Sequence, residues 1–230
     1  VPVQVSSGDW HTCAIMDDAS LQCWGRNTDG QLGDGTNVDS STPVTVSIGE
    51  NVLAVSTGAR HTCAVTQSWA LKCWGDNSNG QLGIGSTTSS NTPSTVTVGG
   101  NAVAVSAGGS HTCVLLDGNG VKCWGENSNG QLGDGGTNQQ NDASTVVITL
   151  TGAISIDSGQ SHTCAVDSSG SLHCWGDSED GQVGDGSTSD QVSSPTEIIL
   201  EQNHGALSIS SGASYTCVVG SNDLAQCWGG

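Results

Sequence analysis

The cysteines and histidines of this sequence are its most reactive side chains, and most of them recur at fixed spacing. A His-Thr-Cys triplet begins at His11 and returns at His61, His111 and His162, and a fifth copy begins with Tyr215. Ten residues after the cysteine of each triplet, a second cysteine precedes Trp-Gly. Thiols and imidazoles are the groups that form disulfides and bind zinc, so this spacing points to one of those two chemistries.

Five local disulfides would use all ten cysteines. The predicted pairs are Cys13–Cys23, Cys63–Cys73, Cys113–Cys123, Cys164–Cys174 and Cys217–Cys227. Directly opposed positions in a hairpin have Cα atoms about 4.5–5.5 Å apart, which is within disulfide range. Disulfides at this density indicate an oxidising compartment, and hence a secreted or surface-exposed protein.

A repeated zinc site is one alternative, since histidine and cysteine two apart on a strand face the same side. However, Tyr215 replaces the histidine of the fifth repeat while both cysteines stay, and three protein ligands would leave each zinc ion open. Free thiols are the other alternative. The sequence favours disulfides.

The repeated histidines are expected to be structural, because a catalytic group is normally unique and these four share one position of a repeat. No Gly-x-Ser-x-Gly nucleophile motif occurs either. The sequence therefore predicts a protein that is not an enzyme.

Two tryptophans stand outside the repeat and are candidate binding residues, Trp10 and Trp69. Trp69 falls near the tip of a predicted hairpin, where other repeats have Ala19, Asn119 or Gly170. An aromatic side chain at a loop tip is typical of a contact residue. Packing of Trp69 on its own repeat is the alternative.

The charge is strongly acidic and unevenly distributed. The net charge of −18 disfavours nucleic-acid binding, because a phosphate surface would repel it. Residues 152–204 hold nine acidic residues and no lysine or arginine, and one loop offers the carboxylates of Asp177, Glu179 and Asp180. Calcium prefers such oxygen ligands, although the spacing matches no EF-hand, and a solvated acidic loop is the alternative. No other cofactor is expected.

These residues are positioned by a repeat whose copies start 50, 50, 51 and 53 residues apart. Each copy predicts an apolar strand such as 52–56, a strand beginning at His-Thr-Cys, a strand ending at Cys-Trp, and a fourth strand such as 42–46 or 93–98. The sequence therefore predicts an all-β propeller of about 50-residue blades, with one Cys-x9-Cys disulfide per blade. No apolar run is long enough for a transmembrane helix, so membrane insertion is not expected.

The pattern Gly-x-x-His-Thr, followed by Trp-Gly-x-Asn-x-x-Gly-Gln-Leu-Gly, resembles the repeat of the regulator-of-chromosome-condensation family. The resemblance implies a β-propeller, usually of seven blades. It allows several functions, including guanine-nucleotide exchange on the GTPase Ran, ubiquitin-ligase modules and a secreted enzyme inhibitor. The paired cysteines depart from the family pattern and argue, with the acidic charge, against the nuclear role in nucleotide exchange.

Residues 1–230 are interpreted as a single propeller or a propeller segment. Its repeats are 1–50, 51–100, 101–151, 152–204 and a partial 205–230. The last repeat lacks a fourth strand, and no spare strand precedes the first. Three explanations are expected for the incomplete last blade. The chain is a segment of a longer propeller, or another chain supplies the missing strand, or the array stays open.

The leading hypothesis is a non-enzymatic extracellular structural or adhesive protein that self-assembles head to tail into a larger assembly or filament. The alternative is a secreted module that binds a protein or a glycan, including the enzyme-inhibitor type. A Ran-type exchange factor is a third hypothesis, and it predicts reduced cysteines.

Overall fold

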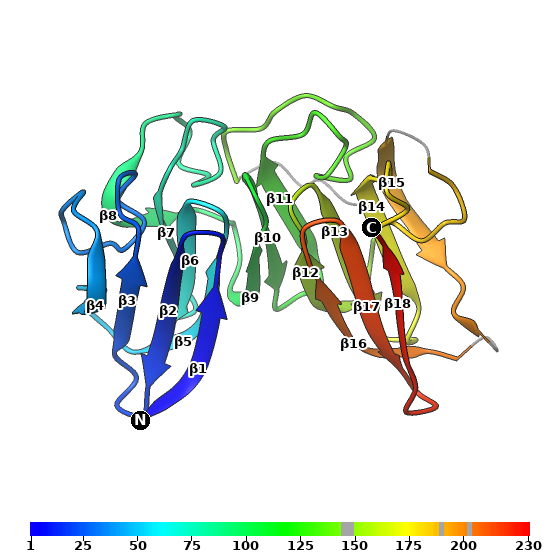
Figure 1. Ribbon diagram of the computed structural model, residues 1–230, viewed down its shortest axis with the longest axis horizontal. Helices are drawn as coiled ribbons and strands as arrows, with labels where there is room; N and C mark the ends of the chain where they lie inside the picture. Colours follow the sequence, from blue (N-terminus) through cyan, green and yellow to red (C-terminus); the bar gives the residue numbers. More distant parts are fainter. Residues whose placement is uncertain (144–149, 189–190, 202–203) are drawn as a thin grey trace.

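The chain forms five antiparallel sheets, and each sheet is built from one repeat (Figure 1). The computed structural model describes residues 1–143, 150–188, 191–201 and 204–230. Within these ranges no α-helix occurs, and so no helix is long and apolar enough to cross a membrane.

The strands of the first two sheets follow one another in chain order. The first sheet contains β1 (Pro2–Ser7), β2 (His11–Met16), β3 (Leu21–Gly25) and β4 (Ser40–Thr45). The second sheet contains β5 (Val52–Thr57), β6 (His61–Thr66), β7 (Leu71–Gly75) and β8 (Ser90–Val96). The predicted fourth strands at 42–46 and 93–98 therefore begin two to three residues earlier than expected.

The remaining sheets repeat the same order. The third contains β9 (Ala102–Ala107), β10 (His111–Leu116) and β11 (Val121–Gly125). The fourth contains β12 (Ala153–Ser158), β13 (His162–Asp167), β14 (Leu172–Asp177) and β15 (Gln191–Ile198). The fifth contains β16 (Ala206–Ser211), β17 (Tyr215–Gly220) and β18 (Ala225–Gly229). In the third sheet Gln140 pairs with Gly125 in an isolated bridge, at the position where β4 and β8 begin in their own sheets.

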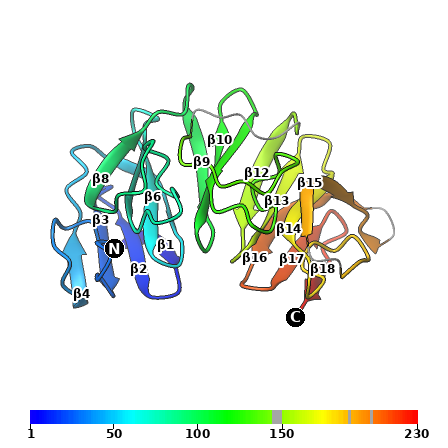
Figure 2. The ribbon, with the colours of Figure 1, turned by 90° about the horizontal axis from the view of Figure 1, so that it is seen from above.

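The five sheets stand side by side as propeller blades around an arc (Figures 1 and 2). The first strand of each blade contacts the first strand of the next, so β1, β5, β9, β12 and β16 follow the inner edge of the arc. The predicted all-β propeller is therefore confirmed. The turns between second and third strands lie at one end with the N-terminus, which we call the hairpin end. The Gly-Gln-Leu-Gly and Gly-Gln-Val-Gly segments lie at the opposite end, which we call the loop end.

The hydrophobic core lies between neighbouring blades. Trp74 is fully buried in a cluster with Leu21 and Leu32 of the preceding blade. Its Nε1 donates a hydrogen bond of 2.9 Å to the backbone carbonyl of Gln31. A side chain at Gly33 would place its Cβ 2.5 Å from that Nε1, which explains why the segment that covers the tryptophan needs glycine. Buried tryptophans join the later blades in the same way.

Candidate binding site

All ten cysteines form disulfides between the second and third strands of a blade. In every pair the two residues are direct cross-strand partners, with Cα atoms 4.1 Å apart. The confirmed pairs are Cys13–Cys23, Cys63–Cys73, Cys113–Cys123, Cys164–Cys174 and Cys217–Cys227. This pairing leaves no thiolate for the zinc alternative.

The four repeated histidines join each blade to the next. His11 Nε2 lies 2.7 Å from Thr62 Oγ1, and the other three make the equivalent contact at 2.8–2.9 Å. Thr62 donates its only hydroxyl proton to the Gln31 carbonyl at 2.8 Å. The threonine must therefore accept from His11, so the imidazole carries its proton on Nε2.

These imidazoles are neutral and closed off from solvent. Desolvation by burial lowers the pKa of His11 and His111 to about 3, and the pKa of His61 and His162 to about 4. The Nδ1 atom of each ring is buried without a hydrogen-bond partner. A buried ring in this position links blades and offers no acid or base to a substrate.

The proposed calcium ligands lie at the loop end of the fourth blade. The Asp177 carboxylate accepts the backbone amide of Glu179 at 3.1 Å, and the Asp180 amide donates to the side chain of Gln182 at 2.9 Å. In the part of the chain that the structure describes, no three His, Cys, Asp or Glu side chains gather into a group that could hold a metal ion. The calcium site stays a prediction without a ligand arrangement to support it.

In the same loop, a serine replaces an asparagine whose hydrogen bonds the first three blades share. In the first blade, the side-chain Nδ2 of the buried Asn27 donates to the carbonyls of Thr36 and Val38 at 3.1 Å. Its Oδ1 accepts a hydrogen bond from the backbone N–H of Leu32. Asn77 and Asn127 repeat this pattern, whereas the fourth blade has Ser178 at the equivalent position. Among the described residues, the Ser178 hydroxyl donates to the Ser187 carbonyl at 3.4 Å.

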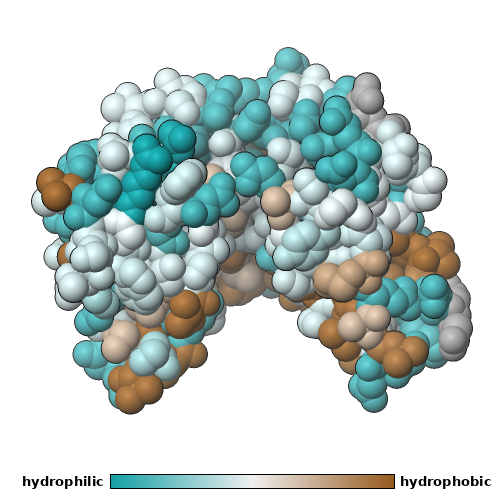
Figure 3. Space-filling model, in the orientation of Figure 1, coloured by the Kyte–Doolittle hydropathy of each residue, from teal (hydrophilic) through white to brown (hydrophobic). Residues whose placement is uncertain are grey.

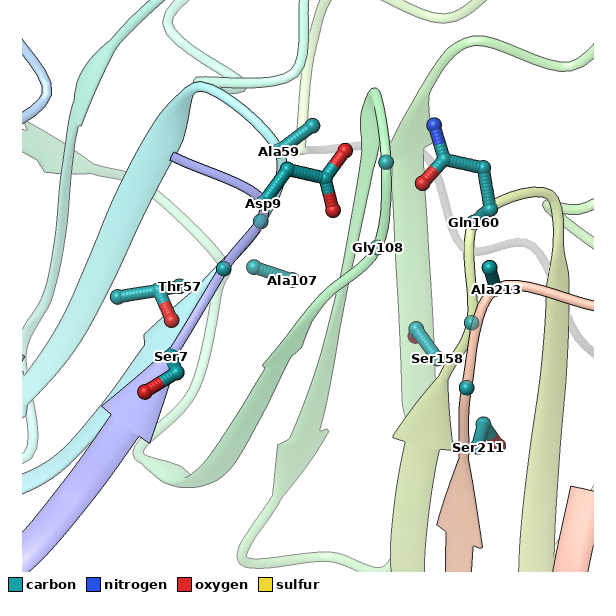
Figure 4. Close-up of a pocket in the computed structure, with 15 residues that line it drawn as sticks. Ser7, Asp9, Thr57, Ala59, Ala107, Gly108, Ser158, Gln160, Ser211 and Ala213 are labelled. Atoms are coloured by element: carbon teal, nitrogen blue, oxygen red, sulfur yellow. The ribbon is translucent and has the colours of Figure 1, made fainter. Parts of the chain in front are cut away.

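The turns that link the first and second strands of the blades surround a hollow of about 160 Å³ (Figure 4). At its rim, Asp9, Ala59 and Gln160 occupy one position of the repeat and share no functional group. Backbone contacts between blades frame it, including the Ala59 amide to the Gly109 carbonyl at 3.4 Å. The rim offers no convergent set of catalytic side chains, and we do not place the functional site there.

The candidate binding residue Trp10 lies at the loop end, next to β2, and is 52% exposed. The Arg26 guanidinium lies over its ring, 5.3 Å from the centroid. This cation–π contact, of a kind worth about 0.5–1 kcal/mol at an exposed site, holds the ring against its own blade.

The other candidate, Trp69, lies in the turn between β6 and β7 at the hairpin end and is 44% exposed. Its φ of 62° falls in the left-handed region, which a bulky residue rarely occupies. Ala19, Asn119 and Asp223 have the same conformation in the first, third and fifth blades, so the turn imposes it, and asparagine and aspartate tolerate it best. The Trp69 carbonyl accepts the Ala102 amide at 3.0 Å, which places Trp69 beside the first strand of the next blade.

Sequence reasoning missed a second feature of the hairpin end. In β5, Val52 pairs with Thr66 and Ala54 pairs with Val65, so a β-bulge leaves Leu53 unpaired. The same register shift leaves one aliphatic residue unpaired in every blade. These bulge residues are Val3, Leu53, Val103, Ile154 and Leu207.

All five bulge residues are exposed. Figure 3 shows hydrophobic side chains gathering toward the hairpin end, whereas the loop end is largely hydrophilic. The signal in the sequence was an aliphatic residue at the second position of every first strand. Composition alone does not reveal the bulge, because a continuous apolar strand and a strand with a bulge have similar composition.

Repeated blades, buried tryptophans and His–Thr contacts between blades define this chain as a β-propeller of one repeat type. The profile of the RCC1-like domain matches residues 1–230, and the chain belongs to that family. The resemblance inferred from the sequence is therefore confirmed. No match was found among curated protein sequences.

Several solved structures share this fold. Human WBSCR16 is 26% identical, with a TM-score of 0.86 over 96% of this chain and 58% of that chain. Yeast RCC1 (Prp20), solved bound to Kap60, is 22% identical, with a TM-score of 0.86 over 99% of this chain and 56% of that chain. The ectodomain of the Physcomitrella patens receptor kinase CR4 is 20% identical, with a TM-score of 0.59 over 99% of this chain and 50% of that chain. This chain spans little more than half the length of the first two.

Proposed function

We propose that this chain forms a non-enzymatic, extracellular β-propeller surface that binds another protein through its hairpin end. The observation that carries the proposal is Trp69. Holding a bulky residue in the left-handed region costs about 1 kcal/mol or more, and asparagine at the same position of the third blade avoids most of that strain. A strained and exposed aromatic side chain is typical of a residue retained for contact with a partner.

The extracellular location rests on the disulfides, because five of them in 230 residues require an oxidising compartment. Protein denatured without a reductant should offer no cysteine to a thiol-alkylating reagent, and ten cysteines after reduction, as mass spectrometry of the intact chain would record. Ten alkylated cysteines in the denatured, unreduced protein would instead favour the intracellular exchange-factor hypothesis.

Partner binding is tested with Trp69→Asn, which preserves the turn. Trp10→Ser is the control, because it removes an exposed tryptophan from the loop end instead. Immobilised wild-type chain and both variants are exposed to the extracellular fraction of the source organism. We expect one protein to bind saturably to wild type and to Trp10→Ser, and to bind Trp69→Asn at least about tenfold more weakly, as for an interface hot spot. Equal retention by all three proteins would contradict the proposal.

Two competing functions predict other outcomes, one in this experiment and one in sedimentation. A glycan-binding module would lose its ligand when the extracellular fraction is treated with glycosidases. Head-to-tail self-assembly into an adhesive filament would appear in sedimentation as concentration-dependent growth of the wild-type chain with no partner added.

A further inference from the structure

The bulge residues form a repeated apolar surface that the fold itself does not need. A β-bulge requires an additional backbone residue, but it does not require that residue to be aliphatic. Leu53, Val103 and Ile154 belong to blades with a neighbour on each side, and they remain 46%, 37% and 57% exposed. Their side chains are thus left uncovered after the blades have packed. Aliphatic residues at all five positions indicate that something else covers them.

Trp69 extends this surface outward. Its carbonyl accepts the amide of Ala102, the residue directly before the bulge residue Val103. The same backbone contact links Ala19 of the first blade to Val52, directly before Leu53. Gly170 makes the equivalent contact with Ala206, directly before Leu207, so the hairpin turns of the first, second and fourth blades are fixed beside the bulge of the following blade. A ligand that reaches the bulge residues would also meet the hairpin turns.

Carboxylates surround these apolar positions. Exposed acidic residues lie in the turns and blade connections of the hairpin end, namely Asp17, Asp18, Glu50, Asp117, Glu201 and Asp223. The described turns and connections at this end contain no lysine or arginine. Lys72 and Lys122 reach this end from β7 and β11; the Lys72 ammonium group donates to the Ile48 carbonyl at 2.9 Å, and the Lys122 ammonium group lies beside Gly99. The surface therefore combines aliphatic contacts along the arc with a negative rim.

We propose, building on the proposed function, that the hairpin end binds a positively charged polypeptide segment whose aliphatic side chains pack on the bulge residues of successive blades. Lysine or arginine on that segment would face the carboxylates of the turns. The charge also argues against a second copy of this chain as the occupant, because two hairpin ends would bring like charges together.

Three synthetic peptides of equal length test this chemistry against the full chain. A Leu-Lys peptide supplies both aliphatic and cationic groups, a Leu-Glu peptide keeps the aliphatic groups and reverses the charge, and a Ser-Lys peptide keeps the charge alone. Fluorescence anisotropy is expected to show saturable binding of the Leu-Lys peptide, with at least about tenfold weaker binding of the other two. Equal binding of the Ser-Lys peptide would overturn the proposal, since net charge alone would explain it.

Variants then locate the site. The triple change Leu53→Ser, Val103→Ser and Ile154→Ser leaves the charge intact. It should weaken binding of the Leu-Lys peptide at least about tenfold. Val38→Ser removes an aliphatic side chain that is 71% exposed at the loop end, and it should have no effect. Asp117→Asn with Asp223→Asn should weaken binding and reduce its dependence on salt.

Circular dichroism and the count of intact disulfides establish that each variant folds. Undiminished peptide binding by a folded triple variant would overturn the proposal. So would loss of self-association or of binding to anionic lipid vesicles as the only effect of that variant, since a second copy or a membrane would then be the occupant. If the native protein partner is lost with Trp69→Asn but not with the triple variant, the proposed function survives and this inference fails.

Discussion

At the scale of single residues, we expect Trp69 to contribute to partner binding and not to the stability of the fold. Replacing it with asparagine relieves backbone strain and removes a side chain that is 44% exposed. We therefore expect Trp69→Asn to unfold in urea with a free energy equal to wild type or up to about 1 kcal/mol higher. A loss of more than about 1 kcal/mol would show that the indole packs on its own blade and would weaken its assignment as a contact residue.

The buried histidines predict a loss of stability in mild acid. Their pKa values of about 3 to 4 in the fold lie below the ordinary value of 6.5, so the unfolded chain binds more protons in between. Stability contributed by each ring is complete above pH 6.5 and is lost as the pH falls toward the folded pKa. Urea denaturation between about pH 6.5 and about pH 5 should show a decline of about 1 kcal/mol per pH unit for each of the rings.

Substitution of one ring provides the control for that pH dependence. Glutamine is not ionisable, and in a His111→Gln variant the side-chain amide would still be a donor for the Thr163 hydroxyl, which His111 contacts at 2.9 Å. The decline with pH should therefore shrink by about a quarter, since four rings contribute. Asp157 acts in the opposite direction, because burial raises its pKa and its contribution weakens as the pH rises. A pH profile unchanged by His111→Gln would contradict this assignment.

At the scale of the strand pair, each disulfide closes a short loop within a hairpin. Removing the buried Cys113–Cys123 pair by Cys113→Ala with Cys123→Ala frees a loop of about 11 residues in the unfolded chain. We expect a destabilisation of about 2–3 kcal/mol, measured as a lower urea midpoint. A midpoint equal to that of wild type would mean that the β10–β11 pairing alone defines the hairpin.

The loop of the fourth blade should become more stable when it carries the asparagine of the first three blades. Ser178→Asn would place an amide beside the Ser187 carbonyl, the counterpart of the Ser86 carbonyl to which Asn77 donates at 2.9 Å. Each additional bond is worth about 1 kcal/mol, so thermal unfolding should shift upward. Asn77→Ser is the reciprocal control and should shift it downward. If both variants melt like wild type, the side-chain amide does not brace this type of loop.

The hairpins could be predicted from the sequence because the residues that pair in each hairpin lie close together in the chain. Ten-residue cysteine spacing determines which positions of the second and third strands face one another, and the observed partners agree. The contacts between blades could not be read in this way. His11 meets Thr62 and Trp74 meets Gln31 only after separate repeats have packed, at sequence separations of 51 and 43. The exposed bulge residues were missed because register, rather than composition, decides that Leu53 is unpaired.

At the scale of the whole molecule, the core lies between the blades, and the loop end and the hairpin end carry different kinds of side chain. The loop end is braced by side-chain amides and is largely hydrophilic, whereas the hairpin end combines aliphatic bulge residues with acidic turns. Membership in the RCC1-like family accounts for the shared architecture. Because one fold carries many functions, our proposal places the function at the end whose side chains the architecture does not use.

The charge of the molecule predicts opposite effects of salt on two kinds of association. With a net charge of −18, copies of this chain repel one another at low ionic strength, whereas a cationic partner is attracted. Raising salt from about 20 mM to about 300 mM shortens the reach of both effects. Sedimentation velocity should therefore show self-association that is unchanged or stronger at high salt, while anisotropy shows weaker binding of the Leu-Lys peptide. Self-association that is strongest at low salt would mean that oppositely charged surfaces of two copies meet. That result would favour head-to-tail assembly over binding of a cationic partner.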